Sequence, residues 1–378
     1  MDAQAPRGAL RFFANMKDPR SNLGRRHRLL DLIVIAITAV ICNADGWEDI
    51  ELFGRCKAKW FATFLDLPHG IPSHDTFARV FARLDPAAFE EAFRQWMAHL
   101  SQTSQGRLIA IDGKTLRRSF DTAAGKAALH MINAWCVTNQ AVLGQVVCDE
   151  KANEITMMPK LLALLDLDGA VVTADAMHCQ KATAQKILDG NGDYLLQVKD
   201  NQPALHENLQ LLFADGLSND CHGVAYDYAV DTDAGHGRIE TRRCWSTWEV
   251  AGVAPADDWP QLRSVACVEQ TRQVGEKVSS ERHYYISSLP GTDAKAILDL
   301  ARGHWGVENQ LHWRMDVVFG EDQRRIRTNH AAENYTRLSR IALNLLKKDT
   351  SRKASIRQKR KLAGWDHDFL LHLLTLEP

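Results

Sequence analysis

Hydrophobic residues recur at helical spacing through residues 29–100 of the chain. In the segment SHDTFARVFAR (73–83), Phe77, Val80 and Phe81 share one face of an expected helix. No strand-like alternation interrupts this region, so the pattern predicts an all-α N-terminal domain over residues 1–100. The SHDTFARVFAR segment could read DNA or could be an amphipathic core helix, and the core interpretation is preferred.

The hydrophobic pattern becomes strand-like from residue 107 onwards. Short apolar runs between turn signals predict strands in RLIAID (107–112), HMINAWCV (130–137), AVLGQVVC (141–148), GAVVTADAM (169–177) and DYLLQVK (193–199). Helical runs lie between the third, fourth and fifth of these strands. The order predicts an α/β fold with a mixed sheet, in which three antiparallel strands precede βαβ units.

The rest of the chain divides into three further segments. Aromatic alternation with several Gly and Pro residues indicates a β-rich insertion at about 200–293. Residues 294–319 read as one long helix, which closes a second domain over residues 101–345. Residues 346–378 are rich in lysine and arginine and are expected to form a basic C-terminal tail.

Composition is that of an ordinary globular protein, with 378 residues, 45% hydrophobic and 25% charged, and a formal net charge of −1. Any affinity for nucleic acid must therefore come from local basic patches. The eight cysteines form no CxxC pair and follow no secretory leader, which favours a cytoplasmic protein. The most hydrophobic run, residues 29–44, contains Asp31 and is too short for a comfortable membrane span, so a core helix is expected.

Three acidic residues are candidates for a metal site. Asp112 and Asp175 each follow an apolar strand, where ligand and catalytic groups gather in open α/β sheets. Carboxylates on neighbouring strands repel unless they share a cation, and oxygen ligands without nearby cysteine favour Mg²⁺ or Mn²⁺ over zinc. Glu308 lies on the expected late helix among tryptophans, where a charge needs a partner. Together the three could bracket two metal ions that clamp the attacking and leaving oxygens of a phosphodiester.

Simpler interpretations of the three acids stay open. Asp112 could be a turn residue, and Asp175 could cap the helix that follows it. Glu308 could form a structural ion pair with Lys295 or Arg302.

The late helix also offers other ligand sets. His304, Glu308 and His312 recur every four residues and could hold zinc, although the chain has no HExxH motif. Further acids follow in Asp316, Glu321 and Asp322, of which Asp316 is nearest in helical phase.

Basic residues surround the candidate acids. Those expected along a DNA path are Lys114, Arg117, Arg118, Lys199, Arg302 and His304. Carboxylates with a rim of lysine and arginine suit a phosphate-rich polymer, because metals sit on the acids while the rim takes the backbone charge. The chain has no Walker loop, GxGxxG or GxSxG motif, so it lacks the signatures of the enzyme classes that depend on them.

Several longer motifs resemble one known family. They are IDGKTLRRS, KANEITMMPKLL, VVTADAMHCQ, DYLLQVKDNQ, GHGRIETR and HWGVENQLHWRMDVVFGED. These strings are similar to bacterial insertion-sequence transposases of the H-repeat-associated group, which are DDE transposases with an RNase H-like core. The resemblance runs from about residue 18 to about residue 345.

The resemblance implies roles for particular residues. Asp112, Asp175 and Glu308 would be the metal-binding triad, and the β-rich insertion would separate the last core strand from the helix that bears Glu308. One departure concerns a Tyr-Arg-Glu-Lys pattern that related transposases often carry around the last acid. The positions of its Arg and Lys hold His304 and Met315 in this chain. Stand-ins would be Arg302 or Arg314.

The expected function is a transposase that cuts and rejoins DNA with two Mg²⁺ ions, which Mn²⁺ could replace. Its partners would be the terminal inverted repeats of an element and the target DNA, bound as a homodimer, in the cytoplasm at the nucleoid. Two alternatives stay open. One is a nuclease or recombination-promoting relative that does not complete transposition, and the other is a catalytically silent DNA-binding protein.

Overall fold

The structure is a computed structural model, and it describes residues 8–22, 25–100, 107–120, 125, 127–148, 154–218, 224–235, 237–253 and 258–376. Residues 1–7 of the expected N-terminal domain and 377–378 of the expected tail lie outside these ranges. Within the described ranges, no helix is both long and apolar enough to cross a membrane.

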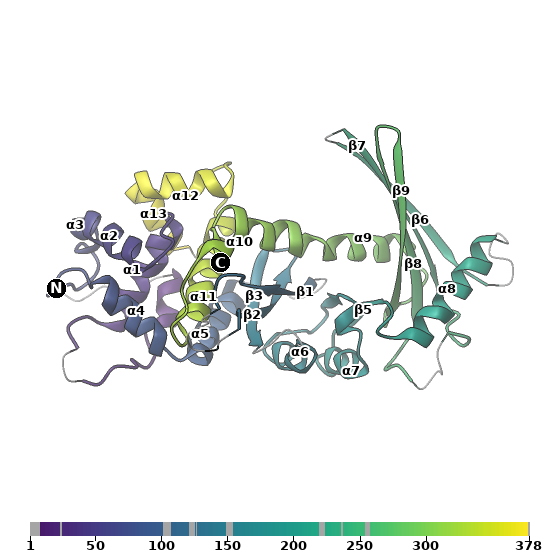
Figure 1. Cartoon of the computed structure of the whole chain (residues 1–378), viewed down its shortest axis with the longest axis horizontal. Coiled ribbons are helices and arrows are strands. Elements are labelled where there is room, and N and C mark those ends of the chain that lie inside the picture. The colour runs from purple at the N-terminus through teal and green to yellow at the C-terminus, as the bar shows by residue number, and fades with distance from the viewer. Residues whose placement is uncertain are drawn as a thin grey trace.

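A mixed sheet runs through the middle of the molecule (Figure 1). Its strands are β1 (Leu108–Thr115), β2 (His130–Cys136), β3 (Ala141–Cys148), β4 (Val171–Ala174), β5 (Asp193–Val198), β6 (Asp227–Gly235), β7 (Arg238–Thr247), β8 (Ser264–Val274) and β9 (Lys277–Ser287). Their order across the sheet is β3-β2-β1-β4-β5-β9-β8-β7-β6. β1, β2 and β3 pair antiparallel, whereas β4 lies parallel to both β1 and β5. The predicted mixed sheet is therefore confirmed.

The expected β-rich insertion supplies β6 to β9, but these strands do not form a sheet of their own. β9 pairs antiparallel with β5, so the four strands extend the same sheet. Figure 1 shows them as long hairpins that project beyond the rest of the fold. The insertion also contains helix α8 (Pro203–Ser218), which the strand-like pattern of the sequence does not reveal.

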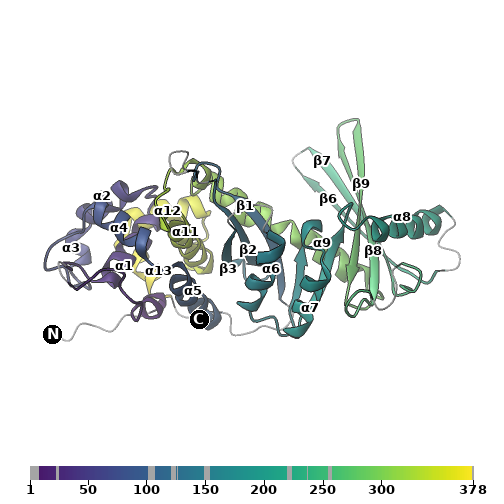
Figure 2. The same ribbon diagram turned by 60° about the horizontal axis from the view of Figure 1, so that its bottom comes forward.

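Helices cover both faces of the part of the sheet made by β1 to β5. α6 (Glu154–Ala163) and α7 (Lys181–Asp189) lie on one face, and α9 (Ala294–His304) lies on the other (Figures 1 and 2). Every residue of β2 is buried. Burial on both faces explains why these strands read as continuous apolar runs in the sequence.

The helical end of the molecule combines the start and the finish of the chain (Figure 1). Its helices are η1 (Gly8–Phe13), α1 (Leu29–Ile41), α2 (Trp47–Cys56), α3 (Ala58–Phe61), α4 (His74–Arg83), α5 (Pro86–Leu100), α11 (Ala331–Lys348), α12 (Ile356–Trp365) and α13 (His367–Leu374). α1 is buried along nearly its whole length and packs on α11, which confirms the core helix expected within residues 29–44. α4 buries Phe77, Val80 and Phe81, so its apolar face is a core face as preferred.

Residues 346–378, which are expected to form a basic tail, are largely packed helices in the part that the structure describes. α12 and α13 pack on α11, and α12 also contacts α1. The buried Lys359 Nζ donates to Leu346 O at 3.1 Å, and the buried Arg360 Nη2 donates to Val40 O at 2.9 Å. These carbonyls lie in the last turns of α11 and α1, where cations stabilise a helix. Part of the basic composition therefore serves the packing of helices.

Candidate active site

The pairing of β1 with β4 brings Asp112 and Asp175 together. The parallel register runs from Leu108 opposite Val171 to Ile111 opposite Ala174. Asp112 is the next residue of β1 and Asp175 directly follows β4, so the register makes them neighbours.

The strand that carries Asp112 is longer than expected. β1 does not end at Asp112, as the sequence suggests, but continues to Thr115. The extra residues pair with β2, with Asp112 opposite Asn133 and Thr115 opposite His130. Asp112 therefore lies where parallel pairing stops and antiparallel pairing goes on, which also removes its interpretation as a turn residue.

Glu308 reaches the same place from a helix that changes geometry. The single helix expected over 294–319 is instead α9, a π-helical turn η4 (Val307–His312) and α10 (Trp313–Val317). Val307 and Leu311 are buried in the π-turn while Glu308 is exposed. Single π-turns within helices are frequent at functional sites.

An acid-rich cleft of about 650 Å³ contains all three predicted carboxylates. The acids that line it are Asp112, Glu154, Asp175, Glu308, Asp316 and Asp322. Burial raises the pKa of Glu308, and the nearby Asp112 raises it further. The two carboxyl groups thus line one cleft although 196 positions separate them in the sequence.

Asp112 and Asp175 differ in how their oxygens are satisfied. Asp112 Oδ1 accepts a hydrogen bond from Gly113 N at 2.9 Å, and Asp112 Oδ2 lies 3.3 Å from His312 Nδ1. Asp175 Oδ1 is buried and has no hydrogen-bond partner, its nearest basic atom being His178 Nε2 at 4.0 Å. Across the described ranges, no three His, Cys, Asp or Glu side chains are arranged to hold a metal ion as they stand. The three acids thus share a cleft without forming a preassembled cluster.

The simpler interpretations of Asp175 and Glu308 do not match their contacts. The N-cap of α7 is Gln180, and Asp175 caps the short 3₁₀ turn η3 (Ala176–His178) without a side-chain bond. Lys295 Nζ bonds to Asp299 Oδ2 at 2.6 Å rather than to Glu308.

The two histidines of the possible zinc site, His304 and His312, contact different residues. His304 Nδ1 lies 3.1 Å from Thr173 Oγ1, while His312 faces Asp112. Burial lowers the pKa of His304, although Asp112 and Asp175 oppose this effect. His304 is therefore half-buried beside Thr173 and favours its neutral form, and the DNA contact expected of it stays a prediction.

Glu154, which sequence reasoning missed, supports the strands behind the cleft. One of its oxygens contacts His130 Nε2, and Oε2 lies 3.2 Å from His178 Nε2. Burial would raise the pKa of Glu154, but the two histidines lower it to about 2. A Cβ at Gly113 would stand only 2.6 Å from Glu154 Oε2, so the glycine leaves room for this carboxylate. The available signal was an acid directly before an apolar helical run, which is common in the first turn of any helix.

Lys114 is a buried structural cation, contrary to the DNA contact expected of it. Its Nζ contacts Asp316 and lies 3.1 Å from Glu321 Oε2. Glu321 also accepts from Arg340 Nη2 at 3.2 Å. Burial would raise the pKa of Glu321, but Arg340 and Lys114 hold it well below its ordinary value. Asp316 and Glu321, the alternative acids of the sequence analysis, are therefore already paired.

The other expected DNA contacts fall into two groups. Arg117, Arg118 and Lys199 are exposed, and Arg117, which lines the cleft, lies 3.4 Å from Asp322 Oδ2. Arg302 instead pairs with Asp231 and Asp233 of β6, at 2.6 and 2.9 Å.

Neither proposed stand-in for the Tyr-Arg-Glu-Lys cations lines the cleft. Arg302 is engaged with β6, and Arg314 Nη2 donates to Gln310 Oε1 at 2.6 Å. Met315, at the position of the Lys, is fully buried. The lysine and arginine side chains among the described residues that line the cleft are those of Lys114 and Arg117.

Comparison with known proteins agrees with this arrangement. Residues 103–345 match the model of the transposase DDE domain, and residues 10–97 match the DDE_Tnp_1-associated model. The putative transposase YncI of Escherichia coli O157:H7 is 39% identical over 374 residues, covering 97% of this chain and 94% of the relative. The H repeat-associated putative transposase YhhI of Escherichia coli K12 is 38% identical over 369 residues, covering 95% of each.

Transposases act on DNA, and DDE transposase domains generally use divalent metal ions. The domain match spans more than half of the chain, and both relatives are matched over nearly their full length. The chain therefore belongs to the DDE transposase family.

Proposed function

We propose that this protein cleaves DNA at the ends of an insertion sequence and transfers the cut strand to target DNA. The observation that carries the proposal is the register of β1 and β4, which makes Asp112 and Asp175 neighbours in a cleft that Glu308 also lines. We infer that residues 101–345 form an RNase H-like catalytic unit and that residues 1–100 form a helical unit associated with it.

Asp112, Asp175 and Glu308 would hold two Mg²⁺ ions, or Mn²⁺ in their place. The donor set fits, because all its atoms are carboxylate oxygens and Asp175 Oδ1 is buried without a hydrogen-bond donor. Such ions lower the pKa of an attacking water and stabilise a departing 3′ oxygen. Glu308 is exposed, so its side chain is free to turn towards the two aspartates.

The surrounding residues position the acids and the DNA. His312 holds Asp112, while Glu154 fixes His178 behind Asp175. Arg117, Arg118 and Lys199 are exposed cations suited to contact phosphates.

Bringing two element ends together requires two active sites, so we propose a homodimer on DNA. Its substrates would be terminal inverted repeats and target DNA, in the cytoplasm at the nucleoid.

The test is cleavage in vitro of a duplex carrying the DNA that flanks the gene, with Mg²⁺ present. Cleaved and joined products are expected from the parent protein. Asp112→Asn should lower the cleavage rate by roughly three orders of magnitude, since metal ligands contribute several kcal/mol to such reactions. Asp316→Asn is the matched control, because this acid lines the same cleft but is already paired with Lys114. Its cleavage rate should stay within about tenfold of the parent.

Other outcomes would support the alternatives. Cleavage without joined product favours a nuclease or recombination-promoting relative. A gel shift with no cleavage under any divalent ion favours a silent DNA-binding protein. Equal cleavage by the parent and Asp112→Asn would refute the assigned site.

A further inference from the structure

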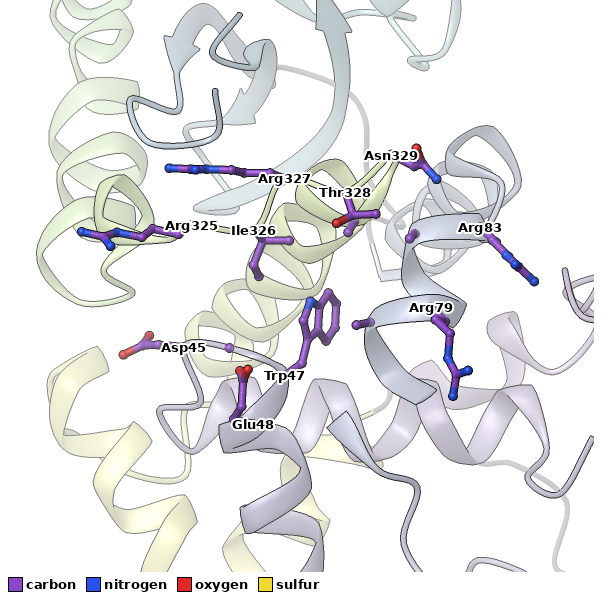
Figure 3. Close-up of a pocket in the computed structure, with 14 residues that line it drawn as sticks. Asp45, Trp47, Glu48, Arg79, Arg83, Arg325, Ile326, Arg327, Thr328 and Asn329 are labelled. Carbon is purple, nitrogen blue, oxygen red and sulfur yellow. The ribbon is translucent and has the colours of Figure 1, made fainter. Parts of the chain in front are cut away.

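A second pocket, of about 570 Å³, lies apart from the acidic cleft, between the N-terminal helices and the loop that follows the helix of Glu308. Its walls are α2, α4 and the loop 325–329 (Figure 3). Trp47 of α2 and Thr328 of the loop face the middle of the pocket. The pocket therefore joins the N-terminal helical region to the domain that bears the acids.

Four arginines dominate the charge of this pocket. Figure 3 shows Arg325 and Arg327 on one side and Arg79 and Arg83 on the other. Only two carboxylates line the same pocket, Asp45 and Glu48. Its rims therefore carry an excess of positive charge in a chain whose net charge is −1.

Within the described residues, carboxylates do not neutralise Arg79, Arg83 or Arg325. Arg83 and Arg325 are exposed, and within the described ranges neither has an acidic partner. Arg79 donates to the carbonyl of Asp75 in its own helix, which leaves its charge without a counter-ion. By contrast, Lys114 and Arg340 near the cleft are neutralised by carboxylates.

The two walls are fixed to each other before any ligand arrives. His330 N donates to Ala82 O at 3.3 Å. Asn334 Nδ2 donates to Phe81 O and Leu84 O at 2.8 and 2.9 Å. A preformed surface loses little conformational entropy on binding, which favours affinity.

The floor of the pocket is held by aromatic packing. Trp47 stacks on Phe81 at 5.2 Å between ring centroids and meets Tyr335 edge-on at 5.1 Å. The arginine rims therefore rest on a rigid base.

The pocket connects to the acidic cleft through bonded neighbours. Arg327 Nε donates to Arg118 O at 3.3 Å, and its guanidinium lies over the ring of Phe120 at 4.9 Å. Arg117, next to Arg118, lines the cleft itself. Cations thus lead from the acids to the rim that the loop 325–329 forms.

We propose that this pocket binds the phosphate backbone of duplex DNA that extends out of the cleft, an inference that rests on the proposed function. Arginines on two opposite rims suit an extended polyanion better than a single small anion, which would require donors that converge on one point. The outer face of α4 thereby contributes to DNA binding while its inner face belongs to the core.

The test measures binding of the full chain to a fluorescent duplex by anisotropy, in EDTA, over a range of salt concentrations. R83Q/R325Q removes one exposed charge from each rim. The slope of log affinity against log salt should become shallower by about 2, because each lost phosphate contact contributes about 0.9. Affinity near physiological salt should fall roughly tenfold or more.

K160Q/K186Q is the matched control, since Lys160 of α6 and Lys186 of α7 line neither this pocket nor the cleft. Its slope and affinity should equal those of the parent. Equal slopes for R83Q/R325Q and the parent would overturn the proposal. So would displacement of the DNA by polyglutamate at the same charge concentration as by unlabelled duplex, which would indicate an acidic protein partner. Melting temperatures of both variants should match the parent, as all four residues lie outside the buried core.

The readout separates this proposal from the catalytic one, because no divalent ion is present. A protein that never cleaves DNA but shows the slope difference would refute only the proposed function. A protein that cleaves normally but shows no slope difference would refute only the binding pocket.

Discussion

Two sets of acids lie within one region of the molecule and differ in how they are paired. Glu321 and Glu154 are buried and each contacts two basic side chains, which lower their pKa values. Asp175 Oδ1 accepts no hydrogen bond and has His178 Nε2 no nearer than 4.0 Å, and the pKa of Glu308 is raised. The paired set stabilises the fold. The unpaired set carries a cost in the folded state, and such a cost is commonly found at functional sites.

The largest loss of stability is expected when the paired acid Glu321 is replaced. Glu321→Gln leaves Lys114 and Arg340 buried without their carboxylate, and removing one partner of a buried ion pair costs roughly 3–5 kcal/mol. Urea unfolding should show this loss. A loss below about 1 kcal/mol would mean that the pairing does not stabilise the fold.

Glu154 should make stability depend on acidic pH. Its pKa falls from 4.5 to about 2 on folding, so its contribution is complete above about pH 4.5 and is lost as pH falls towards 2. The expected loss by pH 3 is about 2 kcal/mol, since pH 3 lies about 1.5 units below the unfolded pKa and each unit is worth about 1.4 kcal/mol. Unfolding of the parent and Glu154→Gln should be compared at pH 5 and pH 3. The variant should show a flatter pH dependence, and parallel curves would contradict the role of Glu154.

Gly113 tests whether Glu154 is held in place. Gly113→Ala sets a methyl group against the Glu154 carboxylate and should cost about 1–3 kcal/mol, as overpacking does. Gly364→Ala in α12 is the control, because a Cβ there meets nothing within 4 Å. The control should raise stability by about 0.5–1 kcal/mol. Equal effects of the two changes would show that Glu154 moves aside.

The smallest effect is expected from the unpaired acids. Asp175→Asn removes a negative charge beside Asp112 and breaks no hydrogen bond of Asp175 Oδ1. The free energy of unfolding should therefore rise or change by less than about 1 kcal/mol. Thermal unfolding in EDTA measures it. A loss comparable with that of Glu321→Gln would place Asp175 among the structural acids.

The sequence predicts the sheet better than it predicts the partners of single charges. Apolar runs mark β1 to β5, and an acid directly after each of two such runs indicates that Asp112 and Asp175 lie at one end of the parallel pairing. The continuation of β1 to Thr115 depends on β2, and no local pattern shows it. The break of the late helix into a π-turn is likewise invisible, since its apolar residues keep a helical spacing.

Long-range ion pairs explain the remaining errors. Lys114 looks like a DNA contact until the fold brings Glu321 to it across about 200 residues of chain. Glu154 looks like an ordinary first-turn acid until His130 and His178 meet it. Charge composition therefore indicates where a polyanion could bind, but only the fold separates free cations from paired ones.

The most direct test of the account locates Mn²⁺ by anomalous diffraction in crystals of the protein bound to DNA. The account predicts anomalous peaks in contact with the carboxylates of Asp112, Asp175 and Glu308. Peaks that contact other acids of the cleft while Glu308 stays apart from the ions would contradict it.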